Sequence, residues 1–332
     1  MALMIPDQVP SAGREYGQSA QQERPDLGRK RRLFRAYEDN KKDEIREQRV
    51  ADRYYHTKQW TDDELSVLRQ RKQPAITSNR VKRKIDFLVG VEQRMRRDPK
   101  AYGRNPQDVE TADTITAALR FVCDNVRWPT IASSGTSEGM RRGVGVAFVG
   151  IKRKRNLLEV DVRDVESERF FYDPRANRHD FSDARYMGVS LWMDVDDAKA
   201  EWPGQDFDKY MEKDGGSSTF AVEQDRAEQW GDFEHRRVRV VEMWEKTLVQ
   251  GEIKWTYCKF CGDLYLEGGP SPYIDEDGES DCPYVAWTPY IDETGCRYGL
   301  VRDMKTIQDE VNQRRSKALH EINSRQIYIE EG

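Results

Sequence analysis

The chain has 332 residues, of which 35% are charged and only 37% are apolar, and its net charge is −5. No run approaches the ~20 consecutive apolar residues of a membrane-spanning helix, so we expect no contact with a membrane. The first ten residues lack the charged and long apolar regions of a signal peptide. The 8 Trp, 15 Tyr and 11 Phe residues exclude a disordered chain. We therefore expect a cytosolic protein whose core is thin or divided into small pieces.

The charges are unevenly distributed along the chain. Between Arg69 and Arg104 there are twelve basic and three acidic residues, an excess of +9. Between Trp192 and Glu234 there are thirteen acidic and four basic residues, an excess of −9. This pattern indicates a molecule with oppositely charged poles, copies that pack head to tail, or a large protein with separately charged faces.

The first part of the chain predicts an arm followed by helices. Residues 1–32 are polar, lack periodicity and end in a basic run, which indicates a mobile basic arm. Helical signals dominate residues 33–142. Thr61 and Glu64 form a capping box, Asn79 is a helix cap, and Asn105-Pro106 begins a further helix. That helix has an apolar stripe at spacings of three and four residues: Val109, Ala112, Ile115, Leu119, Val122 and Val126.

The period changes after Gly143, and residues 143–296 are rich in predicted strands. Short β-rich runs begin at Gly143, Leu158 and Ala184, separated by polar or Gly/Pro turns. Asp194 is a predicted cap of a short helix over 195–201. Two longer runs predict an antiparallel hairpin with its turn near Gln250-Gly251.

The last region, 297–332, predicts one long helix from Arg297 to Arg325 and then the start of an interrupted strand. About 25 helical residues at 1.5 Å rise give roughly 38 Å, which is long for a soluble domain. We expect its apolar stripe to be an oligomer interface: Leu300, Met304, Ile307 and Val311. We expect its basic residues to face a channel or a neighbouring subunit: Arg302, Lys305, Arg314, Arg315, Lys317 and Arg325.

The cysteines suggest one alternative function. Cys258-x₂-Cys261 followed by Cys282 and Cys296 resembles half of a zinc ribbon, which would suit a zinc-dependent nucleic-acid-binding factor. Against this, the second pair lacks the tight spacing, and the first pair lies in a predicted strand. Side chains three residues apart on a strand point to opposite faces. Buried thiols are the simpler interpretation.

Catalytic patterns are weak throughout. Glu252-x-Lys254 has the local form of a restriction-type nuclease site, whose metal would need an upstream acid such as Asp232. Such a short match is frequent by chance, and an exposed hairpin edge explains it equally. The run from Gly143 to Gly150 is no dinucleotide fingerprint, because strand formers follow it. We expect no catalytic residue, no resident metal and no cofactor.

Two stretches resemble a known family. The run from Asn79 to Glu92, followed by Arg94 and Asp98-Pro99, resembles the N-terminal signature of portal proteins from tailed double-stranded DNA bacteriophages, particularly the short-tailed podovirus type. Similar stretches follow later in the chain: Ser271-Pro272-Tyr273, Pro283-Tyr284-Val285, Tyr298-Gly299, residues 308–312 and residues 315–318. The resemblance covers about residues 35–330.

The resemblance implies a portal fold of the α+β class. Residues 33–142 would be a helical wing, 143–296 would include the clip, and 297–332 would hold a stem-type helix. It implies a ring of twelve subunits at one capsid vertex, a conduit for genome packaging and ejection that has no enzymatic activity. Its partners would be the terminase, capsid and scaffolding proteins, a tail adaptor and duplex DNA in transit. Family portals are longer, so we expect the chain to be truncated to the N-terminal half.

The long helix also predicts how DNA is handled. Six basic residues between Arg302 and Arg325 are offset by Asp303, Asp309, Glu310 and Glu321, a net of +2. A wall of mixed charge cannot neutralise many phosphates at once. We therefore expect weak, sequence-independent binding to duplex DNA. A solvated or intersubunit salt-bridged face would carry the same charges.

Overall fold

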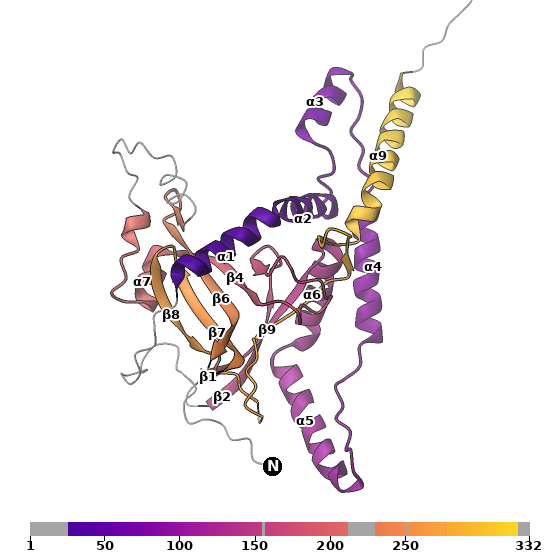
Figure 1. Ribbon diagram of the computed structural model, residues 1–332. Coiled ribbons are helices and arrows are strands. Elements are labelled where there is room, and N and C mark those ends of the chain that lie inside the picture. Colours follow the sequence, from indigo (N-terminus) through magenta and orange to yellow (C-terminus); the bar gives the residue numbers. More distant parts are fainter. Residues whose placement is uncertain (1–25, 155–156, 212–229, 250, 276, 325–332) are drawn as a thin grey trace, which may run out of the picture. The chain divides into compact units, whose positions relative to one another are not determined.

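The computed structural model describes residues 26–154, 157–211, 230–249, 251–275 and 277–324. They form two compact units, each assembled from two separate stretches of sequence. The first unit combines the stretch that ends at Lys41 with residues 146–286, and the second combines residues 42–145 with the stretch that begins at Trp287. Helices, antiparallel sheets and a long last helix make a mixed α+β fold (Figure 1).

An antiparallel sheet of six strands organises the first unit. Its order is β3-β4-β6-β7-β8, and β5 pairs with β6. The bounds are β3 Phe170–Tyr172, β4 Tyr186–Asp194, β5 Gly231–Asp232, β6 Arg237–Val249, β7 Glu252–Cys261 and β8 Leu264–Pro270. The helix α1 (Leu27–Asn40) lies against this sheet, where Phe34 packs edge-on against Phe171 with ring centroids 4.9 Å apart.

The first unit also contains a smaller sheet and two short helices. The smaller sheet has the order β2-β1-β9, with β1 Gly145–Lys154, β2 Leu157–Val165 and β9 Tyr284–Trp287. The short helices are α7 (Val195–Glu201) and the 3₁₀ turn η2 (Asp208–Tyr210). Aromatic rings fill the core, because Phe170, Phe181, Trp230 and Phe260 are all almost fully buried.

The second unit is built mainly of helices. These are α2 Lys42–Tyr55, α3 Asp62–Gln70, α4 Arg80–Met95, the 3₁₀ turn η1 Pro106–Asp108, α5 Val109–Asn125, α6 Trp128–Arg142 and α9 Val301–Asn323, with the strand pair β10 Tyr290–Ile291 and β11 Arg297–Tyr298. Its buried apolar cluster is small: Ala51, Tyr54, Val81, Ile85 and Val301. The expected thin, divided core matches these two separate interiors.

Local signals placed several helix starts correctly. Thr61 and Glu64 form the expected capping box at α3, and the Asn79 side chain accepts a hydrogen bond from the Lys82 amide at α4. The helix expected to begin at Asn105-Pro106 begins instead with the 3₁₀ turn η1, which contains Pro106 and directly precedes α5. Asp194 precedes α7 as expected, but its side chain makes no capping hydrogen bond.

Three expected boundaries differ from the structure. The arm was expected to extend to residue 32, but α1 begins at Leu27, because Asp26 caps the Arg29 amide and Lys30 is buried against Glu245. The last helix begins at Val301, because β11 pairs with β10 just before it. It ends at Asn323, and the expected terminal strand and Arg325 lie outside the described residues.

The β-rich middle also contains one turn more than expected. The predicted hairpin turn is present, with β6 paired to β7 and Gly251 at φ +90°. The second arm then reverses again at Gly262, which has φ +54°, and continues as β8. The sequence suggested consecutive regions, 33–142 and 143–296, whereas each compact unit combines two separate stretches. The helix α1 belongs with the sheet, and the chain after β9 belongs with the helices.

Candidate assembly surfaces

The helix α9 carries the residues expected to form an oligomer interface, and they differ in exposure. Met304 is half-buried and packs against the small apolar cluster of its own unit. Leu300 and Val311 are also half-buried, whereas Ile307 is 64% exposed. The structure therefore leaves Ile307 as the most open member of the predicted stripe, and the interface stays a prediction.

The face of α9 that is buried in its own unit is polar, which periodicity did not predict. Gln308, Asn312 and Ser316 are each about 2–3% exposed. Their oxygens accept hydrogen bonds from the backbone amides of alternate residues in the segment 76–80: Arg80 to Gln308 at 2.8 Å, Ser78 to Asn312 at 2.9 Å and Ile76 to Ser316 at 2.9 Å. We call these three α9 side chains the polar ladder.

The polar ladder is completed by further contacts. The Gln308 side chain donates to the backbone carbonyl of Ser78 at 2.9 Å and to the side-chain oxygen of Asn312 at 3.0 Å. Asn312 donates to the side chain of Gln59 at 2.6 Å. Buried polar groups cost free energy unless each finds a partner. The ladder therefore fixes the extended segment before α4 against α9 through hydrogen bonds.

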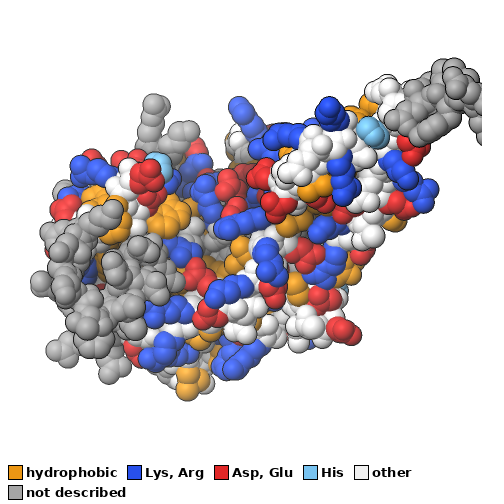
Figure 2. All heavy atoms as spheres, turned by 90° about the horizontal axis from the view of Figure 1, so that it is seen from above, with side chains coloured by type: hydrophobic (Ala, Val, Ile, Leu, Met, Phe, Trp, Pro, Cys, Tyr) orange, Lys and Arg blue, Asp and Glu red, His pale blue; other side chains and the backbone are white. Residues whose placement is uncertain are grey.

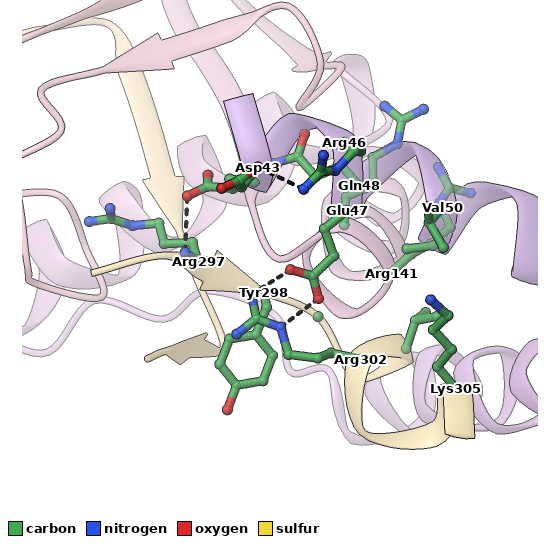
Figure 3. A pocket seen from close by; sticks show the side chains of 15 residues that line it. Asp43, Arg46, Glu47, Gln48, Val50, Arg141, Arg297, Tyr298, Arg302 and Lys305 are labelled. Atoms are coloured by element: carbon green, nitrogen blue, oxygen red, sulfur yellow. Dashed lines mark hydrogen bonds and ion pairs between the residues drawn. The ribbon is translucent and has the colours of Figure 1, made fainter. Parts of the chain in front are cut away.

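A charged pocket of about 500 Å³ lies beside the start of α9, between α2, α6 and residues 297–302 (Figure 3). Arg302 pairs with Glu47 and, at 2.8 Å, with Asp292, and its guanidinium lies 3.9 Å from the Tyr298 ring centroid. Arg297 is 1% exposed, and its backbone amide donates to Glu44 at 3.0 Å. The acids and bases of the pocket thus hold the helices together.

Ion pairing in this pocket shifts two pKa values. The hydrogen bond to Glu47 is the main reason that the pKa of Arg302 lies above its ordinary value. Burial opposes ionisation of Asp292, but hydrogen bonds from Thr294 and Arg302 outweigh it and hold the pKa of that carboxyl well below its ordinary value. Arg302 was expected to face a channel or a neighbour; the structure places it in ion pairs within its own unit.

The other basic residues of α9 are more open. Lys317 lies 3.7 Å from Glu321 and Arg314 pairs with Glu310, all on exposed positions. Lys305 is exposed and lies 5.8 Å from the Tyr54 ring centroid, while Arg315 is exposed. On the face drawn in Figure 2, basic and acidic side chains are intermixed over the described residues. The exposed part of α9 therefore carries both signs of charge.

The cysteines lie where burial keeps them as thiols. Cys258 and Cys261 are fully buried in β7, and burial raises the pKa of the first to about 11 and of the second to about 12. Burial likewise raises the pKa of Cys296 to about 11 and that of Cys282 further. Zinc binds the thiolate form. No group of three or more His, Cys, Asp and Glu side chains within the described residues could hold a metal ion.

The residues of the nuclease alternative are engaged in pairs. Lys254 lies 2.9 Å from Glu252 near the exposed end of the β6–β7 hairpin. Asp232 pairs with Arg237 at 2.7 Å and with the ring of His235. The described geometry therefore favours the exposed hairpin edge. In the described part of the chain, no helix is long and apolar enough to span a membrane.

Comparison with known protein sequences found one matching family and one curated relative. A sequence model of the family "Phage P22-like portal protein" matches residues 31–332. A portal protein of the Helicobacter pylori bacteriophage KHP30 is 19% identical over 286 residues. That alignment covers 85% of this chain and 44% of the relative, so the chain spans less than half of the relative's length.

Proposed function

Because the chain belongs to the phage P22-like portal protein family, we propose that it forms a ring at one capsid vertex, through which duplex DNA is packaged and later ejected. The family match over residues 31–332 is the observation that carries this proposal. The family is one of structural phage proteins without enzymatic activity. The resemblance stated from the sequence is thereby confirmed at the level of the family.

The composition of α9 supports its role as a stem-type helix of the ring. Its 23 residues at 1.5 Å rise give a helix of about 35 Å. Between Val301 and Asn323 it has five basic and four acidic residues, a net of +1. A wall of nearly balanced charge lets phosphates pass without the strong, salt-dependent affinity of a basic groove. We propose that the exposed charges of α9 face the channel or a neighbouring subunit.

Exposed apolar side chains in the first unit support several partners. Leu248 and Ile253 face each other across the end of the β6–β7 hairpin and are 73% and 67% exposed. Apolar surface of this kind marks sites of protein association. We propose the terminase, capsid and scaffolding proteins and a tail adaptor as partners. The ring would hold twelve subunits and would lie at the virion vertex after assembly in the host cytoplasm.

Light scattering after size exclusion, with negative-stain microscopy, tests the ring. We expect the protein to form closed rings at micromolar concentration. Ile307→Asp places a charge on the most exposed position of the α9 stripe and should shift rings to monomers. Thr306→Asp adds the same charge one position along the helix and is the matched control. A wild-type protein that stays monomeric would contradict the proposed function.

A gel-shift assay with duplex DNA tests the conduit role. At 150 mM salt we expect weak binding of random duplexes that strengthens only modestly when salt is lowered, because few phosphates are neutralised at once. Replacing Arg314 and Arg315 by Ala should change this affinity little. Tight binding to one sequence at 150 mM salt would contradict the conduit and favour a DNA-binding factor.

A further inference from the structure

Most residues of the helix α5 in the second unit are exposed or only half-buried. Of its residues, only Ala112 and Thr116 are buried, where the extended segment before it covers them and the Ala101 amide donates to Thr116 at 3.0 Å. Three further residues of its apolar stripe are open, with Val109 55%, Ile115 46% and Leu119 40% exposed, whereas Val122 and Val126 are half-buried. In Figure 1, α5 extends away from the other helices of its unit. Such a helix buries too little surface to account for its apolar composition.

A second exposed face of α5, on the side of the helix away from the apolar stripe, combines acidic and apolar residues. These residues recur at helical spacings of three and four and are Glu110, Asp113, Ala117, Phe121 and Asp124, which we call the α5 face. Phe121 is 67% exposed. The side chains of Glu110 and Asp113 make no hydrogen bond or ion pair with any residue that the structure describes. The α5 face is therefore acidic at its start and has an aromatic side chain near its end.

A complementary face lies on α4. Its residues share the same helical spacing and are Arg83, Phe87, Gly90 and Arg94, which we call the α4 face. Phe87 is 61% exposed, and a Cβ added to Gly90 would meet nothing within 4 Å. Neither Arg83 nor Arg94 has a hydrogen-bond or ion-pair partner among the described residues. Glycine destabilises a helix interior, and nothing among the described residues packs on Gly90 in a way that requires it.

The two faces match each other in charge and shape. One offers carboxylates and Phe121; the other offers guanidinium groups, Phe87 and a notch at Gly90 where a second helix can approach closely. Both helices belong to the second unit, and every residue of the two faces is exposed within it except Gly90, which is half-buried. They do not cover each other in one subunit. A second copy of the chain supplies each face with the other.

We propose that the α5 face of one subunit packs on the α4 face of the next. This inference rests on the proposed ring, because contact between two different faces of the same chain is heterologous and closes into a ring when the rotation allows it. Oppositely charged faces set the direction of association and suppress contacts between like faces. The partner is thus a second copy of this chain, and the basic α4 and acidic α5 are the two halves of one joint.

Charge exchange between the faces tests the joint. One variant has Glu110→Lys and Asp113→Lys on α5, and the other has Arg83→Glu and Arg94→Glu on α4. By light scattering, each variant alone should need at least tenfold more protein for half-maximal assembly than the wild type. A 1:1 mixture of the two variants should recover assembly, because alternating subunits restore opposite charges at every joint. Thr111→Lys, at an exposed position of α5 outside the α5 face, is the matched control and should assemble normally.

Each outcome has one meaning. If the wild type does not assemble, the proposed ring fails. If the wild type assembles and both exchange variants assemble equally well, the ring stands and the α5–α4 joint is wrong. If one chain that carries all four substitutions assembles but the mixture does not, the faces meet inside one subunit, which also contradicts the proposal. Circular dichroism of each variant establishes that α4 and α5 remain helical.

Gly90→Leu gives a second measurement that does not depend on charge. The new side chain enters open space in its own subunit and replaces a poor helix former, so the subunit should unfold at an equal or higher urea concentration. In the joint it fills the notch against which α5 packs. We expect assembly to weaken at least tenfold while the fold stays intact. Unchanged assembly would place Gly90 outside the interface.

Discussion

In the first unit, α1 packs Phe34 and Tyr37 onto a sheet whose interior is aromatic, with ring centroids about 5–6 Å apart. In the second unit, five buried apolar residues are supplemented by the polar ladder and by ion pairs such as Arg302 with Asp292. The first unit is stabilised chiefly by apolar burial and the second by side chains that satisfy backbone amides. A chain with 35% charged residues thus builds one apolar core and one hydrogen-bonded helical framework.

The largest expected loss of stability follows from removing an aromatic ring from the core of the first unit. Phe171 is 1% exposed and contacts Phe34 and Tyr37. Phe171→Ala should lower the free energy of unfolding of the first unit by about 3–5 kcal/mol. Hydrogen exchange read by peptide separates the two units, and peptides of β3, β4 and β6 should lose protection. In dilute monomer, Phe87→Ala, at an exposed position of α4, is the matched control and should change stability by less than about 0.5 kcal/mol.

The next effect breaks the polar ladder. Asn312→Ala removes the acceptor of the Ser78 amide and the donor to Gln59, and leaves the half-buried amide and the buried Gln59 side chain without these partners. At roughly 1–3 kcal/mol for each unsatisfied group, we expect a loss of about 3 kcal/mol, confined to the second unit. Gln313→Ala, at the exposed neighbouring position, should change little. Equal urea midpoints for the two variants would show that the ladder contributes no stability.

These two regions were not equally predictable from sequence. The strands and the capping signals at Thr61 and Asn79 depend on neighbours within a few residues, and the structure contains them. The long last helix was also predicted, since its apolar residues recur without Gly or Pro. Its apolar stripe stays the predicted interface, but the polar face that is buried in its own unit was not predicted.

The polar ladder could not be inferred because its partners are distant in sequence. Gln308, Asn312 and Ser316 recur every four residues, which for polar residues usually marks a solvated face. Their partners lie more than two hundred residues earlier. The one available signal was that the portal resemblance includes residues 308–312 and 315–318, and it was not interpreted as buried polarity. The same distance explains why the discontinuous units were missed. β11 pairs with the neighbouring β10, and it was missed because strands of two residues leave too short a pattern in the sequence.

A smaller effect concerns the pH dependence of the second unit. The pKa of Asp292 is depressed in the folded protein, so its stabilising contribution is present above its unfolded pKa of about 3.9 and is lost as pH falls toward the folded value. The urea midpoint of the second unit should therefore decrease below about pH 4. Asp292→Asn should reduce this decrease, and Glu293→Gln, at the exposed neighbour, should leave it unchanged. An Asp292→Asn profile identical to that of the wild type would contradict the ion pair with Arg302.

The smallest expected effect on stability is that of Ile307→Ala, and comparison with the same substitution at the buried Ile85 sharpens the contrast within the second unit. Ile85 is fully buried, and Ile85→Ala should cost about 2–5 kcal/mol of unfolding free energy. Ile307 is 64% exposed on α9, and Ile307→Ala should change the stability of the isolated subunit by less than about 0.5 kcal/mol. The effect on ring assembly should be in the opposite order to the effect on stability. Ile307→Ala should weaken assembly more than Ile85→Ala, because in the proposed ring a neighbouring subunit covers the Ile307 side chain. Urea unfolding of dilute monomer and light scattering of concentrated protein separate the two readouts. A loss of more than 1 kcal/mol in dilute Ile307→Ala would mean that the α9 stripe packs inside its own subunit, and an unchanged ring would remove Ile307 from the interface.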